Sequence, residues 1–87
     1  MNKVFTDHGW KDYVYCQTED KKTMKKINNL IEDIARNGNE GIGKPEPLTG
    51  NLSGCWSRRI NDKDRFIYKI DEENVSILAC RYHYNDK

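Results

Sequence analysis

Apolar residues recur with a helical period in the first half of the chain and with a strand period in the last third. Val4-Phe5 form a short apolar stretch that predicts a strand, and Thr6 or Asp7 can cap the helix that follows it. The spacing of three, four and seven residues places four side chains on one side of that helix: Trp10, Tyr13, Val14 and Gln17.

A second helical stripe begins almost directly after the first. Asp20 can cap this helix, and Asn37-Gly38 form a suitable end. Its apolar side is made of Met24, Ile27, Leu30, Ile31 and Ile34. Because hardly any loop separates the two helices, we expect an antiparallel helical hairpin.

The stretch 39–51 carries glycines, asparagines and both prolines, and it predicts a long loop. Pro45 and Pro47 stiffen the backbone on both sides of Glu46 and favour an extended conformation there. A long loop in a small domain is often functional, which makes Glu46 a candidate site residue. The alternative is a solvated glutamate in a rigid linker.

Three strand-like runs follow, at 55–60, 65–70 and 75–84, separated by turns at 61–64 and 71–74. They predict an antiparallel three-stranded meander. Together with the first strand and the helical hairpin, this gives one α+β domain whose helices cover one face of the sheet.

Strict alternation assigns the strand side chains to two faces. In the second run, Phe66, Tyr68 and Ile70 oppose Arg65, Ile67 and Lys69. In the third run, Val75, Ile77, Ala79, Arg81 and His83 oppose Leu78, Cys80, Tyr82 and Tyr84.

Composition bounds the function. With 87 residues the chain has room for one domain and one small core, and the net charge of +1 gives no overall basic signal for nucleic acid. Three widely spaced cysteines without a Cys-x-x-Cys motif predict reduced, buried thiols. Cys80 and His83 would point to opposite faces of a strand, which argues against a zinc site. We expect no signal peptide, no membrane helix and a cytoplasmic protein.

Two local basic clusters remain. Arg59, Arg65 and Arg81 can lie on adjacent strands of the uncovered sheet face, where several arginines are typical of a phosphate site. The alternative is ordinary surface ion pairing with Asp62, Asp64 or Glu46.

The second cluster opens the second helix and consists of Lys21, Lys22, Lys25 and Lys26. Lysines at this end oppose the helix dipole, so a role in contacting phosphates competes with an ordinary solvated face offset by Glu19 and Asp20.

Glu46, Arg65 and His83 together supply the groups that cleave RNA without a metal. A carboxylate can take the proton of a ribose 2′-hydroxyl, an imidazole can protonate the leaving 5′-oxygen, and a guanidinium can stabilise the phosphorane charge.

Three strings carry a family resemblance, in this order: Lys44-Pro45-Glu46-Pro47-Leu48, Ser57-Arg58-Arg59-Ile60 and Arg81-Tyr82-His83-Tyr84. With them, nearly the whole chain resembles the YoeB (Txe) family of toxins, which belong to the RelE-like superfamily of type II toxin–antitoxin systems. The resemblance implies one RelE-like toxin domain over residues 1–87, with 85–87 as a flexible tail beyond the Tyr at which the family often ends.

The resemblance further implies a ribosome-dependent mRNA endonuclease that cuts the codon in the A site, leaving a 2′,3′-cyclic phosphate and a 5′-hydroxyl, with no metal or cofactor. Glu46 would be the general base, Arg65 would stabilise the transition-state phosphate, and His83 would be the general acid. Tyr84 would orient or stack on the mRNA, and Lys44 and Arg59 would contact phosphates or bases.

The implied partners are a Phd/YefM-type antitoxin, the bacterial 70S ribosome with its mRNA, operator DNA reached only through the antitoxin complex, and a second copy of the chain. Two rival functions stay open. One is a non-catalytic inhibitor resembling the ParE family, which poisons gyrase. The other is an RNA- or protein-binding module that uses the arginine face.

Overall fold

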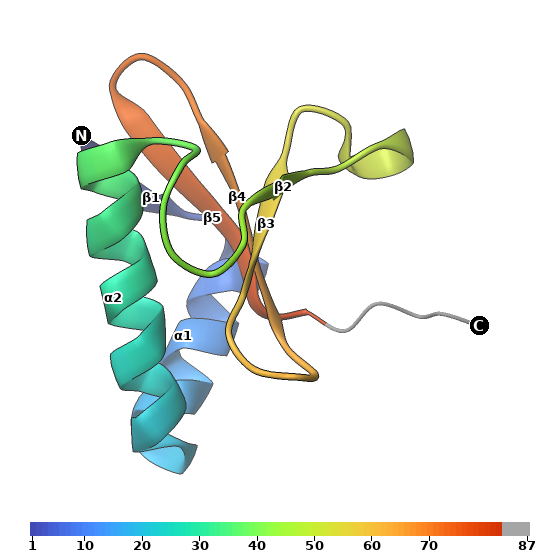
Figure 1. The fold of residues 1–87 in the computed structure, drawn as a ribbon. Coiled ribbons are helices and arrows are strands. Elements are labelled where there is room, and N and C mark those ends of the chain that lie inside the picture. The colour runs from blue at the N-terminus through green and yellow to red at the C-terminus, as the bar shows by residue number, and fades with distance from the viewer. Residues whose placement is uncertain (83–87) are drawn as a thin grey trace.

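A five-stranded sheet with two helices packed on one face makes up the computed structural model, which describes residues 1–82 (Figure 1). The elements are β1 (Asn2–Phe5), α1 (Asp7–Glu19), α2 (Lys21–Asn37), β2 (Glu46–Pro47), the 3-10 turn η1 (Gly50–Leu52), β3 (Trp56–Arg59), β4 (Arg65–Ile70) and β5 (Asn74–Tyr82). The strand order is β1-β5-β4-β3-β2. The predicted α+β class is confirmed.

The sheet is larger than the predicted three-stranded meander. β1 pairs in parallel with β5, and β2 pairs antiparallel with β3 at the other edge. Both additions satisfy backbone groups along strands that would otherwise be edges of the meander. Pro47 fits in β2 because an outermost strand does not need every N–H for pairing.

The helix ends follow the predicted caps. Thr6 Oγ1 accepts from the N–H of Gly9 at the start of α1 (3.0 Å), and Asp20 Oδ1 accepts from the N–H of Thr23 at the start of α2 (3.1 Å). Gly38 ends α2 with a φ of +68°, a conformation that glycine adopts without the clash a Cβ would cause.

The main core lies between the helices and the sheet. The apolar stripe of α2 contributes Ile27, Leu30, Ile31 and Ile34, which pack on strand residues that include Phe66, Tyr68, Val75 and Ile77. Each fully buried side chain of this size contributes about 1.5–3 kcal/mol relative to exposure. A smaller cluster of Cys55, Ile67 and Ala79 lies on the opposite face, which we call the open face.

The three cysteines are free thiols and are buried, as predicted. Burial raises the pKa of Cys16 and raises that of Cys80 to about 12, so both stay protonated and unreactive near neutrality. Within the described residues no group of three His, Cys, Asp or Glu side chains could hold a metal ion, and no helix there is long and apolar enough to cross a membrane.

β5 does not keep strict alternation. Ile67 of β4 pairs with Ala79. The next residue of β4, Tyr68, pairs with Ile77, so β5 holds one extra residue, Leu78, at this step. Such a bulge moves every later side chain to the other face.

A second irregularity lies between Ala79 and Tyr82. The prediction that Ala79 shares a face with Ile77 was therefore wrong, because Ala79 lies in the open-face cluster and Cys80 lies in the main core. Tyr82 packs with the open-face cluster.

The N-terminal turn of α1 rests on the first bulge. The backbone N–H of Thr6 donates to the carbonyl of Ile77 (3.0 Å), and the Thr6 hydroxyl donates to the carbonyl of Leu78 (3.2 Å). A Cβ on Gly9 would lie 2.2 Å from the Ile77 oxygen, closer than real Cβ contacts allow. Glycine at position 9 therefore sets how closely α1 can approach β5.

We expect Gly9→Ala to destabilise the fold by about 1–3 kcal/mol or more, because backbone on both sides must shift to admit the methyl group. Urea unfolding followed by circular dichroism measures this loss. Gln17→Ala, at an exposed position of α1, is the matched control and should stay within about 0.5 kcal/mol of wild type. Equal stability of the two variants would contradict the close approach of α1 to β5 at Gly9.

Candidate active site

A buried arginine positions the loop that leads to Glu46. Arg58 lies in β3 with 0% of its surface exposed, and its side chain enters the helix side of the sheet. It forms an ion pair with Asp33 of α2 and donates to the carbonyls of Gly38 (2.7 Å) and Ile42 (2.9 Å). One guanidinium therefore joins β3, α2 and the loop after α2.

The same loop is held by close backbone contacts. Asp33 also accepts from the N–H of Ile42 (3.1 Å), and the N–H of Arg59 donates to the carbonyl of Gly43 (2.7 Å). Lys44 then adopts a φ of +52°, which is unfavourable for a residue with a Cβ. Strained residues of this kind are found where the surrounding structure fixes a functional segment, and here the segment is the one that carries Glu46.

Glu46 begins β2 and pairs with Ser57 of β3, which in turn pairs with Ile67 of β4. Ile67 belongs to the open-face cluster. Because cross-strand partners point to the same side of a sheet, the Glu46 side chain lies on the open face, and it is exposed.

Two arginines lie one step further along the same face. Arg59 pairs with Arg65, and Arg65 pairs with Tyr82, so the three residues form a row across β3, β4 and β5. The Arg65 guanidinium donates to the carbonyls of Asn61 (2.9 Å) and Asp64 (3.2 Å), which orient it. Arg59 is exposed and Arg65 is half-buried.

The structure therefore brings Glu46, Arg59 and Arg65 to one exposed face. Arg59 and Arg65 were predicted on the uncovered sheet face, whereas Glu46 was predicted in a loop and lies in β2. Lys44 is exposed two residues before Glu46. His83 and Tyr84 lie outside the described residues; along the chain they follow directly after Tyr82.

Arg81 does not join the other two arginines, contrary to the prediction. Its guanidinium carbon lies 3.7 Å from the centre of the Tyr15 ring of α1, in a cation–π contact on the helix side. Strand alternation had already grouped Arg81 with Val75 and Ile77, which lie in the main core, so the observed face of Arg81 agrees with that pattern and not with the predicted arginine face.

The four lysines lie on the first two turns of α2, in the helix layer, and are exposed or half-exposed. Lys22 and Lys26 line a surface hollow of about 470 Å³ with Ile60 and Asn61 from the end of β3 and the turn after it. The lysine cluster is therefore a separate surface from the open face that carries Glu46.

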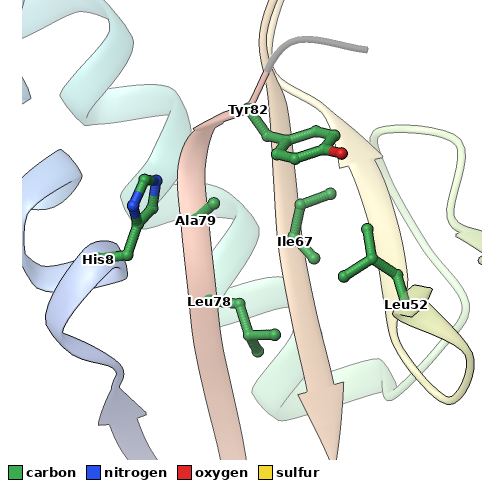
Figure 2. Close-up of a pocket in the computed structure, with 6 residues that line it drawn as sticks. All are labelled: His8, Leu52, Ile67, Leu78, Ala79 and Tyr82. Carbon is green, nitrogen blue, oxygen red and sulfur yellow. The ribbon is translucent and has the colours of Figure 1, made fainter. Parts of the chain in front are cut away.

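An apolar pocket lies on the open face next to the arginine row. Figure 2 shows its lining: the Tyr82 ring lies above Ile67, Leu52 lies beside Ile67, and His8 of α1 lies on the other side of β5. The pocket volume is about 260 Å³, and the remaining lining residues are Leu78 and Ala79. Sequence patterns did not indicate it, because the bulged residue Leu78 and the distant residues His8 and Leu52 meet only in the fold.

The ion pair with Arg58 makes part of the stability depend on pH. The hydrogen bond from Arg58 holds the pKa of Asp33 below its ordinary value, despite an opposing contribution from burial. A carboxylate with a lowered folded-state pKa stabilises the fold above its unfolded-state pKa, about 3.9, and this stabilisation is lost as the pH falls through the folded-state value.

We expect the free energy of unfolding to fall on acidification below about pH 4, with a smaller fall in Asp33→Asn, which has no charge to lose at that position. Urea titrations at a series of pH values measure both slopes. Equal slopes in the two proteins would show that this carboxylate is not linked to folding.

The neighbouring arginines offer a matched pair. Arg58→Gln leaves Asp33 and the loop carbonyls without a cationic partner, so we expect a loss of about 3–5 kcal/mol or failure to fold. Arg59→Gln changes an exposed side chain and should keep stability within about 0.5 kcal/mol. Thermal and urea unfolding measure the stability of both variants. Similar losses in the two would contradict the burial of Arg58 and the exposure of Arg59.

Almost the entire chain is similar to known proteins. Residues 5–84 match a family described as "YoeB-like toxin of bacterial type II toxin-antitoxin system". Toxin YoeB of Streptomyces coelicolor is 54% identical over 84 residues, covering 97% of this chain and 100% of that protein. Toxin YoeB of Escherichia coli K12 is 50% identical over the same length, covering 97% and 100%.

Solved structures agree. A YoeB/ParE toxin from Agrobacterium tumefaciens superposes with a TM-score of 0.92 at 41% identity, covering 97% of this chain and 100% of that chain. The toxin in a heterotetrameric YoeB–YefM complex from Staphylococcus aureus gives 0.90 at 49% identity, and a YoeB dimer from the same organism gives 0.91 at 49%. Both cover 97% of this chain and 98% of the other.

Proposed function

This chain belongs to the YoeB-like toxin family of bacterial type II toxin–antitoxin systems, and on that basis we propose that it is a ribosome-dependent mRNA interferase. It would cut mRNA in the ribosomal A site and so stop translation. The observation that carries the proposal is the joint placement of Glu46, Arg59 and Arg65 on the open face.

Each group has one role in the proposed cleavage. Glu46 takes the proton of the ribose 2′-hydroxyl, which attacks the adjacent phosphate, and the leaving 5′-oxygen receives a proton from His83. The electrons and protons balance with a 2′,3′-cyclic phosphate and a 5′-hydroxyl as products, and no metal is needed. Arg65 stabilises the charge that develops on the phosphorane, because its guanidinium is fixed by the Asn61 and Asp64 carbonyls.

The remaining predicted residues contact RNA in this proposal. Lys44 and Arg59 are exposed beside Glu46 and Arg65 and suit contacts with mRNA phosphates. Tyr84 orients or stacks on a base. Arg81, held against Tyr15, is better suited to contact RNA from the helix side than from the open face.

In this proposal the chain needs the ribosome because so small a protein supplies only part of the rate enhancement. General acid and base groups each contribute about a hundred- to ten-thousandfold. Holding the mRNA in a reactive geometry must supply the rest, and the ribosome is a large scaffold for that. The lysine cluster that opens α2 is a second, separate basic surface, which suits binding of ribosomal RNA phosphates while the open face acts on mRNA.

The relatives indicate the partners. Since the Staphylococcus aureus relative is described in a YoeB–YefM complex and as a dimer, we infer that this chain binds a Phd/YefM-type antitoxin and can pair with a second copy. Operator DNA would be reached through the antitoxin complex only. The site of action would be the bacterial cytoplasm, where ribosomes translate.

Primer extension on mRNA from a translating bacterial extract tests the proposal. Wild-type protein should produce stops at A-site codons, and Glu46→Ala and His83→Gln should remove them by lowering the rate about a hundredfold or more. Arg36→Gln, at an exposed position in the last turn of α2, is the folded control and should cleave normally. The same reactions without ribosomes should leave the RNA intact.

Other outcomes point to the rival functions. Blocked translation with intact mRNA, unchanged by either substitution, would indicate a binding inhibitor. Toxicity in cells that is unchanged by His83→Gln and accompanied by gyrase inhibition would indicate a protein that works like the ParE toxins. Equal cleavage of free and ribosome-bound RNA would contradict ribosome dependence alone.

A further inference from the structure

Asp12 is a buried carboxylate that the proposed cleavage does not use. It lies in α1 and is 7% exposed. Its Oδ2 accepts hydrogen bonds from the backbone N–H groups of Cys80 (3.0 Å) and Arg81 (3.2 Å), 68 and 69 residues further along the chain. His8 Nε2 lies 3.5 Å from the same oxygen.

These two N–H groups belong to the irregular part of β5. Cys80 and Arg81 lie between Ala79, which pairs with Ile67, and Tyr82, which pairs with Arg65. An irregular step leaves backbone donors out of the ladder, and a buried donor requires another partner. One carboxylate oxygen provides it for both residues, so the helix completes the hydrogen bonding of the strand.

The bonds to Asp12 bear on the register of β5 against β4. A slip of one residue would exchange the two sides of the strand, moving Tyr82 from the open face to the helix side. A strand with two irregularities against the same neighbour is poorly defined by pairing alone. The bonds to Asp12 fix which residues stand out of the ladder, and a second contact, between the Cys80 thiol and the Gly9 carbonyl (3.8 Å), lies beside them.

We propose that Asp12 is a positioning residue for the cleavage: by binding the Cys80 and Arg81 amides it fixes the register in which β5 delivers Tyr82 to the open face beside Arg65. This inference rests on the proposed function. Asp12 touches no reacting atom in this scheme, so it acts on catalysis only through the end of β5.

The test separates turnover from ribosome binding. Asp12→Ala removes the acceptor, and Asp12→Glu keeps the charge but moves the carboxylate by one methylene. At saturating ribosome, we expect each to lower kcat about ten- to a hundredfold, because small misplacements of catalytic groups have effects of this size. The half-saturating ribosome concentration should stay within about twofold, because the lysine surface on α2 is unchanged.

Asp12→Asn is the conservative variant, because its amide oxygen can accept the same two hydrogen bonds. It should restore kcat to within about threefold of wild type, and Glu32→Ala, which removes an exposed carboxylate from α2, should have no effect. If Asp12→Ala does not fold at the assay temperature, the Glu and Asn variants carry the comparison.

A second measurement uses no mRNA and tests directly whether Asp12 holds the Cys80 and Arg81 amides. In ¹H–¹⁵N spectra, the Cys80 and Arg81 amide signals should shift and exchange faster with solvent in the Glu variant, while the Asn variant should keep both protected. Wild-type kcat in a folded Ala or Glu variant whose two amide signals have changed would overturn the proposal, and so would a loss confined to ribosome affinity. If the wild-type protein leaves mRNA intact, the proposed function fails, and amide protection still decides whether Asp12 holds β5.

Discussion

The burial of one guanidinium determines much of this small fold. Arg58 is fully enclosed, and its donors reach a carboxylate on α2, the carbonyls of Gly38, Glu40 and Ile42, and the hydroxyl of Tyr68. A buried charge is tolerated only when it is paired and its hydrogen bonds are satisfied. The loop after α2 must therefore wrap around the guanidinium, and that path determines where β2, and with it Glu46, joins the sheet.

The candidate site is thus supported from two directions. Arg58 and its loop hold the β2–β3 side, which carries Glu46 and Arg59. The N-terminal half of α1 holds the β5 side through contacts of Thr6, Gly9 and Asp12, spaced three residues apart, with the irregular strand. Arg65 lies between the two and is the shared partner in the row Arg59–Arg65–Tyr82. Each supporting contact joins segments far apart in sequence.

Local patterns in the sequence were read correctly for physical reasons. The caps at Thr6 and Asp20, the end at Gly38 and the bounds of β4 depend on neighbours within a few residues, so they are visible in the chain itself. The parallel pairing of β1, the bulge at Leu78 and the burial of Arg58 depend on contacts across the fold. Alternation correctly grouped Ile77 and Arg81, but it wrongly grouped Ala79 with them, because the bulge at Leu78 is not visible in the pattern.

The pairing of β1 with β5 has a consequence for the order of events during synthesis. Among the described strands β1 pairs with β5 alone, and β5 is made after every other strand of this sheet (Figure 1). Contacts of such long sequence separation form late and slowly. While residues 74–82 are inside the exit tunnel, β1 has no partner, and α1 has no bulge on which to rest. A growing chain whose residues 74–82 have not yet emerged therefore lacks the assembled open face.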